Sequence, residues 1–265
     1  MDSRDVRYKT HDNSEIRAHL VVPEVKTNRA GIIVIQEIFG LTDFISGVAD
    51  RLAGQGYIAL APHLYSRKDQ DELFTQKNIM NAMTPMFSIP PEKRRDPSVL
   101  NEIMSKSDET TKKIITDLMI NRHQVEKNML KDIESAYDFL KTNYNVHKMG
   151  VIGFCMGGGL TFQISTIKPF EASAVYYGAN PKPIEAVANI KGAVLGIYAG
   201  EDSSINQGLP ELMKAIVEYK TNFEMKLYPG THHAFFNHTG PSYNEDASQD
   251  AWERTLDLFK KYLGD

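Results

Sequence analysis

The segment 150–159 constrains the fold of this chain more than any other stretch. An apolar, strand-like run passes directly into Gly153-Phe154-Cys155-Met156-Gly157, which places the only cysteine of the 265 residues at the centre of a Gly-x-Cys-x-Gly pentapeptide. Such a pattern is typical of a sharp strand-to-helix turn that exposes the central side chain, with small neighbours where the backbone passes close to other segments. The segment therefore predicts a strand, a tight turn and a helix, with Cys155 at the turn.

Cys155 has two interpretations at this position. As a nucleophile it reacts as a thiolate, and the partial positive charge at the N-terminus of the following helix stabilises that anion. As a structural residue it is a buried cysteine in a glycine-rich turn, a common situation for free cysteines. The pentapeptide alone favours the nucleophile and leaves the structural interpretation open.

Short apolar runs alternate with longer amphipathic runs along the whole chain. This alternation is typical of an α/β fold, a mostly parallel central sheet with helices on both faces, because strands covered on both faces are almost continuously hydrophobic. An N-terminal antiparallel hairpin, at 6–9 and 16–22, is expected at the sheet edge. The predicted buried strands are 31–36, 57–61, 148–154, 172–177, 193–199 and 224–228, and the predicted helices are 42 or 43 to 54, 125–143, 209–219 and 247–263.

The segment from about 66 to 123 interrupts this alternation. It is polar, rich in Lys, Asp, Met and Pro, and too long for an ordinary connection, so we expect a partly helical insertion within a single domain spanning 1–265. Unbranched methionines adapt to irregular apolar surfaces, so Met80, Met83 and Met86, with Phe87, are candidates to line a flexible cover over a pocket. The alternative is that they pack the insertion onto the domain or against a second subunit.

Composition and charge exclude several classes of function. The net charge of −4 and the sequence pI near 6.1 give no electrostatic footprint for DNA or RNA, and the one basic run, Lys93-Arg94-Arg95, is interpreted as a solvated loop. A single cysteine excludes an internal disulfide and a Cys-rich zinc site. No apolar run is long enough for a signal peptide or a membrane span, so a soluble cytoplasmic protein is expected. We expect no cofactor and no metal, and the oligomeric state stays open.

A cysteine nucleophile needs a base, and two later segments supply candidates. Asp202 follows the predicted strand 193–199, and a histidine follows the predicted strand 224–228. Loops beyond the carboxyl ends of strands are where open α/β sheets assemble their sites. The chain order is nucleophile, acid, histidine, which is the order of α/β-hydrolases. Each residue alone has an ordinary explanation, as a cap, a turn residue or a solvated side chain, but three in this order favour a catalytic triad.

Two neighbouring histidines compete for the role of base. His232 and His233 are adjacent in a loop and do not easily point into one site. We favour His233, because it begins a His-Ala-Phe sequence, and expect His232 to be structural or to support the site. No His-Glu-x-x-His spacing accompanies them, which argues against a metal site.

The chain resembles the dienelactone hydrolase family, the carboxymethylenebutenolidases and their relatives, over nearly its whole length. The resemblance rests on Gln-Glu-Ile-Phe-Gly at 36–40, Gly-Tyr at 56–57, Ala-Pro-His-Leu-Tyr at 61–65, Gly-Phe-Cys-Met-Gly-Gly at 153–158, Tyr-Tyr-Gly at 176–178, Gly-Glu-Asp at 200–202, His-Ala-Phe at 233–235 and Glu-Arg-Thr-Leu-Asp at 253–257.

This resemblance implies an α/β-hydrolase fold with a triad of Cys155, His233 and Asp202. It also implies that Glu37 contacts the resting thiol and helps to form the thiolate when substrate arrives. The expected chemistry is acyl transfer from a lactone or a small ester, in which the backbone N–H groups of Ile38 and Met156 hold the oxyanion.

Substrate identity is not fixed by these residues. The resemblance implies arginines that bind the carboxylate of dienelactone, but the position four residues after His233 is Asn237 here, and the other arginine cannot be aligned onto Arg94, Arg95 or Arg122. A thioesterase is one alternative, and a non-catalytic small-molecule-binding protein on a hydrolase scaffold is another. A redox-sensitive thiol protein would need an intermolecular partner, because the chain has no second cysteine.

Overall fold

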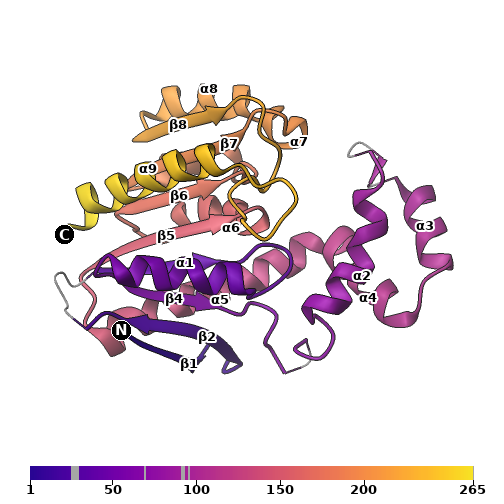
Figure 1. The fold of residues 1–265 in the computed structure, drawn as a ribbon, viewed down its shortest axis with the longest axis horizontal. Coiled ribbons are helices and arrows are strands. Elements are labelled where there is room, and N and C mark those ends of the chain that lie inside the picture. The colour runs from indigo at the N-terminus through magenta and orange to yellow at the C-terminus, as the bar shows by residue number, and fades with distance from the viewer. Residues whose placement is uncertain (25–29, 69, 91–92, 95, 265) are drawn as a thin grey trace.

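The central sheet is the frame on which all the candidate site residues are mounted (Figure 1). The computed structural model describes residues 1–24, 30–68, 70–90, 93–94 and 96–264. Within these residues the sheet has eight strands in the order β1-β2-β4-β3-β5-β6-β7-β8. The first two pairings, β1 with β2 and β2 with β4, are antiparallel, and all later pairings are parallel. The strands are β1 (Asp2–Lys9), β2 (Glu15–Val22), β3 (Ala30–Ile35), β4 (Ile58–Pro62), β5 (Lys148–Phe154), β6 (Ala172–Tyr176), β7 (Ala193–Ala199) and β8 (Phe223–Tyr228).

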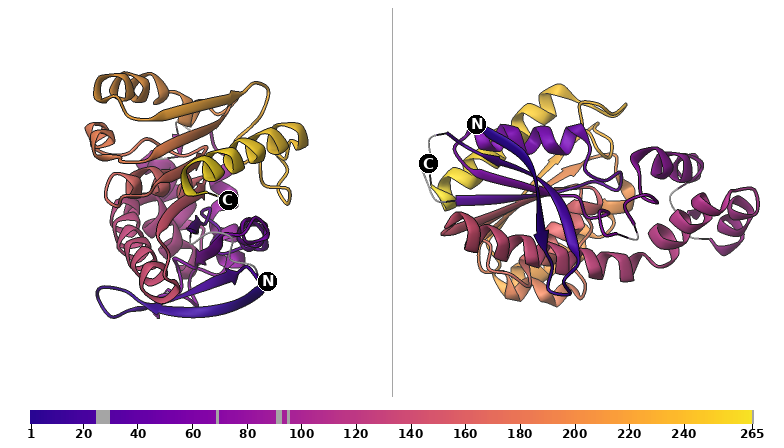
Figure 2. Two further views of the ribbon diagram at one scale, coloured as in Figure 1. Left: turned by 90° about the vertical axis from the view of Figure 1, so that its left-hand side faces the viewer. Right: turned by 90° about the horizontal axis from the view of Figure 1, so that it is seen from below.

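Helices cover both faces of the sheet (Figure 2). One face carries α1 and α9, whose buried side chains join a cluster with β3, β5, β6 and β7. The other face carries α5, α6 and α8. The helices of this layered part are α1 (Asp43–Gly54), α5 (Arg122–Tyr144), α6 (Met156–Ser165), the short α7 (Ser203–Asn206), α8 (Leu209–Tyr219) and α9 (Glu245–Leu263), with a 3₁₀ turn η3 (Ile184–Asn189).

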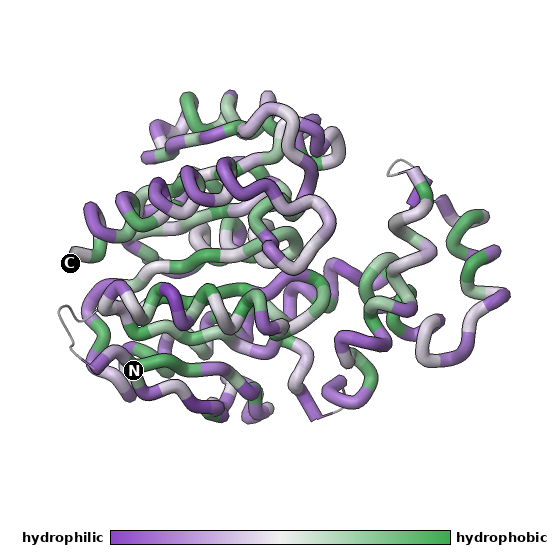
Figure 3. The backbone as a smooth tube through the Cα atoms, viewed as in Figure 1, coloured by the Kyte–Doolittle hydropathy of each residue, from purple (hydrophilic) through white to green (hydrophobic). Residues whose placement is uncertain are grey.

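The near-continuous hydrophobicity of the central strands has its expected consequence. Every residue of β3, β4, β6 and β7 is buried, and apolar residues run along the strands in Figure 3. The predictions for β5, β7 and α8 are confirmed with identical bounds, and those for the other central strands within one residue. The N-terminal hairpin is confirmed as the edge pair β1 and β2. β1 starts earlier than expected, and the prediction missed its first residues because they are exposed and polar.

The insertion consists of helices that project beyond the carboxyl ends of the strands (Figure 1). They are α2 (Gln76–Phe87), α3 (Pro97–Ser105) and α4 (Glu109–Ile115), followed by a π-helical turn η2 (Thr116–Ile120) that leads into α5. Met83 and Met86 are buried in an apolar cluster that includes Ile114, whereas Met80 is 45% exposed. Met83 and Met86 therefore pack the insertion, as in the second interpretation above; the Phe87 side chain, Pro91 and Arg95 lie outside the described residues.

Candidate functional site

The turn between β5 and α6 places the thiol at the carboxyl edge of the sheet. Cys155 has φ +57° and precedes the first residue of α6, so its backbone is in a conformation that L residues rarely adopt. A Cβ on Gly153 would lie 2.2 Å from the carbonyl oxygen of Gly157, and one on Gly157 would lie 2.4 Å from that of Gln36. The two glycines are therefore required by the backbone itself, as the pentapeptide predicted.

Asp202 and His233 meet beside this turn although 31 residues separate them. Asp202 follows β7 and caps α7, where it also accepts hydrogen bonds from Ser204 Oγ at 2.7 Å and the Ile205 N–H at 3.4 Å. His233 Nδ1 contacts Asp202 Oδ2 in a short hydrogen bond. Asp202 is only 5% exposed, so the carboxylate is held in place on several sides. His232, by contrast, is exposed.

His233 joins the acid to the thiol. Its Nδ1 is hydrogen-bonded to Asp202, and Cys155 lies close enough to affect the charge of its ring. Burial alone lowers the pKa of this imidazole, but the Cys155 thiol and the Asp202 carboxylate outweigh burial and raise the pKa to about 10. The pKa of Asp202 is lowered in turn, since the hydrogen bond and charge of His233 outweigh the opposing effect of burial. The arrangement favours an imidazolium held between two groups that bear or develop negative charge.

Glu37 lies in the loop after β3 and is 3% exposed. Burial raises its pKa to about 7, against the hydrogen bond from Asn237 and the charge of His233, which both lower it. Asn237 Nδ2 donates to Glu37 Oε2 at 2.8 Å, while Asn237 Oδ1 accepts from the Thr239 N–H and hydroxyl. Among the described residues Cys155 affects the pKa of His233, whereas it is not among the groups that shift the pKa of Glu37.

The loop that carries Glu37 also carries one candidate oxyanion donor. Ile38 follows Glu37, and its carbonyl accepts the hydroxyl of Tyr65 at 3.0 Å. The same hydroxyl lies 3.8 Å from Met156 Sδ. Met156 is the first residue of α6, so its N–H has no acceptor within the helix and is free to bind a ligand. Tyr65 therefore ties together the two segments that supply the Ile38 and Met156 N–H groups.

Arg122 brings a positive charge toward the thiol. It is the first residue of α5, and its Nε donates to Glu126 Oε1 at 2.6 Å. Burial lowers its pKa, but Glu126 and, more weakly, Cys155 and Tyr65 raise it, with a net rise. The charge of Arg122, one of the three arginines considered from the sequence, interacts with Cys155.

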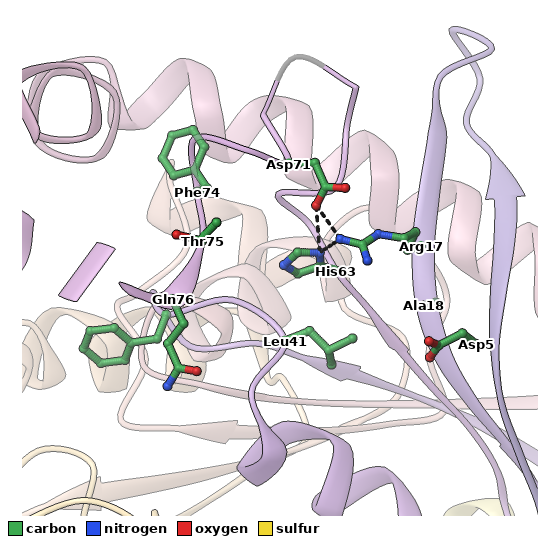
Figure 4. Close-up of a pocket in the computed structure, with 10 residues that line it drawn as sticks. Asp5, Arg17, Ala18, Leu41, His63, Asp71, Phe74, Thr75 and Gln76 are labelled. Carbon is green, nitrogen blue, oxygen red and sulfur yellow. Dashed lines mark hydrogen bonds and ion pairs between the residues drawn. The ribbon is translucent and has the colours of Figure 1, made fainter. Parts of the chain in front are cut away.

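A cavity of about 300 Å³ is lined by residues that include Arg17, His63 and Asp71 (Figure 4). Arg17 Nη2 bonds to His63 Nδ1 at 3.3 Å and also contacts Asp71, as the dashed lines show. Burial and the charge of Arg17 lower the pKa of His63, against Asp71. Phe39 and Leu41, from the loop that carries Glu37, line the cavity, whereas none of the triad residues does.

Three residues of the site escaped the reasoning from sequence. Tyr65 and Tyr177 stood inside quoted motifs without a role, and Asn237 was noted only as a departure from the family pattern. Nothing in their residue types indicated the contacts with Ile38, His233 and Glu37, because each contact joins segments distant in the chain. The quoted motifs marked the positions of the two tyrosines, but not the contacts they make.

Other chemistries were sought in the described part of the chain. No cluster of three or more His, Cys, Asp or Glu side chains suited to a metal ion occurs there. None of the helices in those residues combines the length and apolar character needed to cross a bilayer.

Comparison with known sequences gives matches over almost the whole chain. The sequence profile of the dienelactone hydrolase family matches residues 16–263. A protein of Saccharolobus solfataricus that carries the name carboxymethylenebutenolidase is 47% identical over 250 residues, covering 94% of this chain and 95% of the relative. A Synechocystis protein with the same name is 29% identical over 267 residues, covering 96% and 94%.

Solved structures have the same fold. A structure from Klebsiella pneumoniae described as a dienelactone hydrolase aligns with TM-score 0.73 and 23% identity, covering 98% of this chain and 99% of that one. A dienelactone hydrolase-like promiscuous phosphotriesterase from metagenomic libraries aligns with TM-score 0.72 and 20% identity, covering 99% of both. These likenesses confirm the predicted α/β-hydrolase fold. With the profile match and the 47% identical relative, they establish that the chain belongs to the dienelactone hydrolase family and is a hydrolase that acts on ester bonds.

Proposed function

We propose that the protein hydrolyses a lactone or a small ester through a Cys155–His233–Asp202 triad. The observation that carries this proposal is the strained turn of Cys155 at the carboxyl edge of the sheet together with the hydrogen-bonded pair of His233 and Asp202, where Cys155 raises the pKa of His233. A non-catalytic binding protein has no need for a nucleophile on a strained turn, a base and an acid to orient that base.

In the acylation step, the Cys155 sulfur attacks the carbonyl carbon of the substrate. The carbonyl oxygen becomes an oxyanion, held by the backbone N–H groups of Ile38 and Met156. Collapse of this intermediate breaks the bond to the leaving oxygen, which takes a proton from the His233 imidazolium. The product is a thioester on Cys155; from a lactone, the new hydroxyl stays tethered to the acyl chain.

Deacylation returns the site to its starting state. Neutral His233 takes a proton from water, and the resulting hydroxide attacks the thioester carbonyl. Collapse releases the carboxylic acid and the Cys155 thiolate, and leaves the proton on His233. Asp202 stabilises this imidazolium and fixes the ring so that Nε2 faces the reacting atoms.

Glu37 has a separate role in this proposal. In the free enzyme it contacts the thiol and accepts its proton as substrate binds, which limits oxidation of a permanently exposed thiolate. Support comes from its burial and from a pKa of about 7, which allows both charge states near neutral pH. In the structure described above, Cys155 interacts with His233 and Glu37 accepts a hydrogen bond from Asn237. This arrangement corresponds to the activated site in the proposed scheme.

Steady-state hydrolysis tests the triad directly. The substrates are p-nitrophenyl acetate, an acyl thioester, a neutral lactone and cis-dienelactone. We expect Cys155→Ala to abolish turnover and Asp202→Asn to lower kcat by about 10⁴-fold, because the imidazole loses its orientation. Residual turnover in Cys155→Ala equal to wild type would refute a cysteine nucleophile. If the wild type turns over no substrate and Cys155 resists iodoacetamide, the binding-protein alternative replaces this proposal.

The same panel addresses substrate charge. Asn237 stands where the family resemblance implies an arginine, and Glu126 already pairs with Arg122, so the site offers little unpaired positive charge to a carboxylate. We therefore expect the neutral lactone and ester to be better substrates than cis-dienelactone. A higher kcat/KM for cis-dienelactone would reverse this assignment and point to Arg122 as the carboxylate partner.

A further inference from the structure

Tyr177 directly follows β6 and carries two unusual features at once. Its side chain is fully buried, and its hydroxyl has no hydrogen-bond partner among the described residues. Leaving a buried hydroxyl unpaired is unfavourable, because the group loses its hydrogen bonds to water and gains none in the protein. Its backbone has φ +39°, a conformation that is strained for a bulky residue. An unpaired buried hydroxyl and a strained backbone at the same residue indicate that this residue has a functional role.

The residues that contact Tyr177 indicate what this role is. The centroid of the Tyr177 ring lies 4.9 Å from that of the His233 ring and 5.8 Å from that of the Phe235 ring. The side chain therefore packs against the catalytic histidine. Its N–H donates to the carbonyl of Ile197 at 2.7 Å, which fixes its backbone to β7. With no exposed surface, the hydroxyl cannot reach a substrate directly and must act on a neighbouring protein group.

Three titratable groups among the described residues affect the pKa of this hydroxyl. Burial raises the pKa of Tyr177 most, and the Glu37 carboxylate, the Cys155 thiol and Tyr176 raise it further, in that order. Tyr177 therefore stays protonated at physiological pH, so its hydroxyl has a proton to donate. Tyr176 is already satisfied, because its hydroxyl donates to the Ala251 carbonyl at 2.9 Å and pairs with Thr255.

Glu37 is the neighbour that lacks donors. It is almost fully buried, and Asn237 is the side-chain donor that the described residues give it. A buried carboxylate needs two or three donors to remain ionised at low cost. His233 also faces it and favours the charged form. A donor at Tyr177 would satisfy the tyrosine and the glutamate together.

We propose that Tyr177 is a positioning residue that holds the ionised form of Glu37 by donating its buried hydroxyl to the carboxylate. In the arrangement described here Glu37 is turned to Asn237 and the Tyr177 hydroxyl is unpartnered. In the ionised form the carboxylate accepts both donors. Tyr177 thus sets the pH at which Glu37 is able to take the Cys155 proton, which rests on the role proposed for Glu37 above.

The test measures the rate of Cys155 alkylation by iodoacetamide as a function of pH. In the wild type we expect a step near the Glu37 pKa of about 7. In Tyr177→Phe the step moves to higher pH by about one to two units, because a hydrogen bond to the charged form is lost. Alkylation requires no turnover, so a failure to hydrolyse any ester leaves this test intact.

Tyr198→Phe is the matched control. The Tyr198 hydroxyl is also buried and has no hydrogen-bond partner in the described part of the chain, but burial is the cause that raises its pKa there, with no contribution from Glu37 or Cys155. Its alkylation profile should superimpose on the wild type. Identical profiles for Tyr177→Phe and Tyr198→Phe would reduce Tyr177 to a packing residue and overturn the proposal.

Two further measurements separate the remaining explanations. In Glu37→Gln the step should vanish, and adding Tyr177→Phe should change nothing more; a further change would show that the hydroxyl acts on Cys155 directly, against the proposal. If Tyr177→Phe does not fold, crystal structures of the unaltered protein at about pH 5 and about pH 9, on either side of the Glu37 titration, decide the matter. Absence of a Tyr177–Glu37 hydrogen bond at the higher pH would refute it.

Discussion

The strand ends that carry the triad and the helical insertion beyond them are stabilised in different ways. Around Cys155 the backbone is fixed by contacts between segments far apart in the chain: α6 approaches the end of β3 so closely that Gly157 has no room for a Cβ. In the insertion each helix starts from a local signal. Thr75, Asp96 and Asp108 cap α2, α3 and α4 through side-chain hydrogen bonds to N–H groups two or three residues later.

This difference teaches where each region can tolerate change. The strand ends depend on long-range approach, so one added methyl group disturbs several segments together. The insertion depends on caps and on an apolar cluster that it shares with the sheet, and within this cluster the Phe74 ring stacks on the Tyr65 ring with their centroids 4.7 Å apart. Tyr65 in turn bonds the Ile38 carbonyl, so this stacked pair is one contact between the insertion and the oxyanion loop.

The largest expected effect on stability comes from adding a single methyl group in α6. In Gly157→Ala the new Cβ would lie 2.4 Å from the carbonyl oxygen of Gln36 and 2.5 Å from that of Ile35, and backbone atoms cannot turn aside. We expect a loss of more than about 3 kcal/mol in the free energy of unfolding, measured by urea denaturation.

Gly159→Ala, two residues further along the same helix, is the control. Its Cβ would come no closer than 3.5 Å to Ala179, which is ordinary contact, so better helix propensity should raise stability by up to about 1 kcal/mol. Equal effects of the two substitutions would mean that close approach to β3 does not fix this turn.

A second prediction concerns the charge buried at the strand ends. The pKa of Glu37 rises from 4.5 to about 7 on burial, so the folded protein binds this proton more tightly than the unfolded chain. Ionisation therefore opposes folding: the cost is absent below the unfolded value and complete once the pH has risen through the folded value. Glu37→Gln removes the charge, and should stabilise the protein by about 3 kcal/mol at high pH and very little at low pH.

Urea midpoints measured across this range check the sign. Stability of the wild type should fall relative to Glu37→Gln as the pH rises through about 7, the folded pKa. A difference between the two proteins that does not vary with pH would show that the pKa of Glu37 is the same in the folded and unfolded states. The capping carboxylates of the insertion act in the opposite sense, because hydrogen bonds from Ser98 and Thr111 lower the pKa of Asp96 and Asp108.

Sequence reasoning succeeded where a signal was local or repeated. The apolar runs located the central strands, because strands covered on both faces need continuous hydrophobicity, and the family motifs pointed to Cys155, Asp202 and His233, which the fold brings together. It could not supply the Asn237–Glu37 hydrogen bond or the position of Tyr177 behind His233, since both depend on how loops from different strands meet. The insertion helices were expected only collectively, because their caps lie in a polar stretch without clear periodicity.

The smallest expected effect tests whether the insertion is a separate unit of stability. Met83 is 3% exposed in α2, and truncation to alanine should cost about 2 kcal/mol of local packing. If the insertion opens independently of the sheet, Met83→Ala should speed amide hydrogen exchange in α2 and α4 by about 30-fold and leave β5 unchanged. Met80→Ala, in the same helix at a position 45% exposed, should change neither. Faster exchange in β5 with Met83→Ala would mean that the insertion and the sheet open together. The stacked pair of Phe74 and Tyr65 would then couple the two regions far more strongly than a single contact indicates.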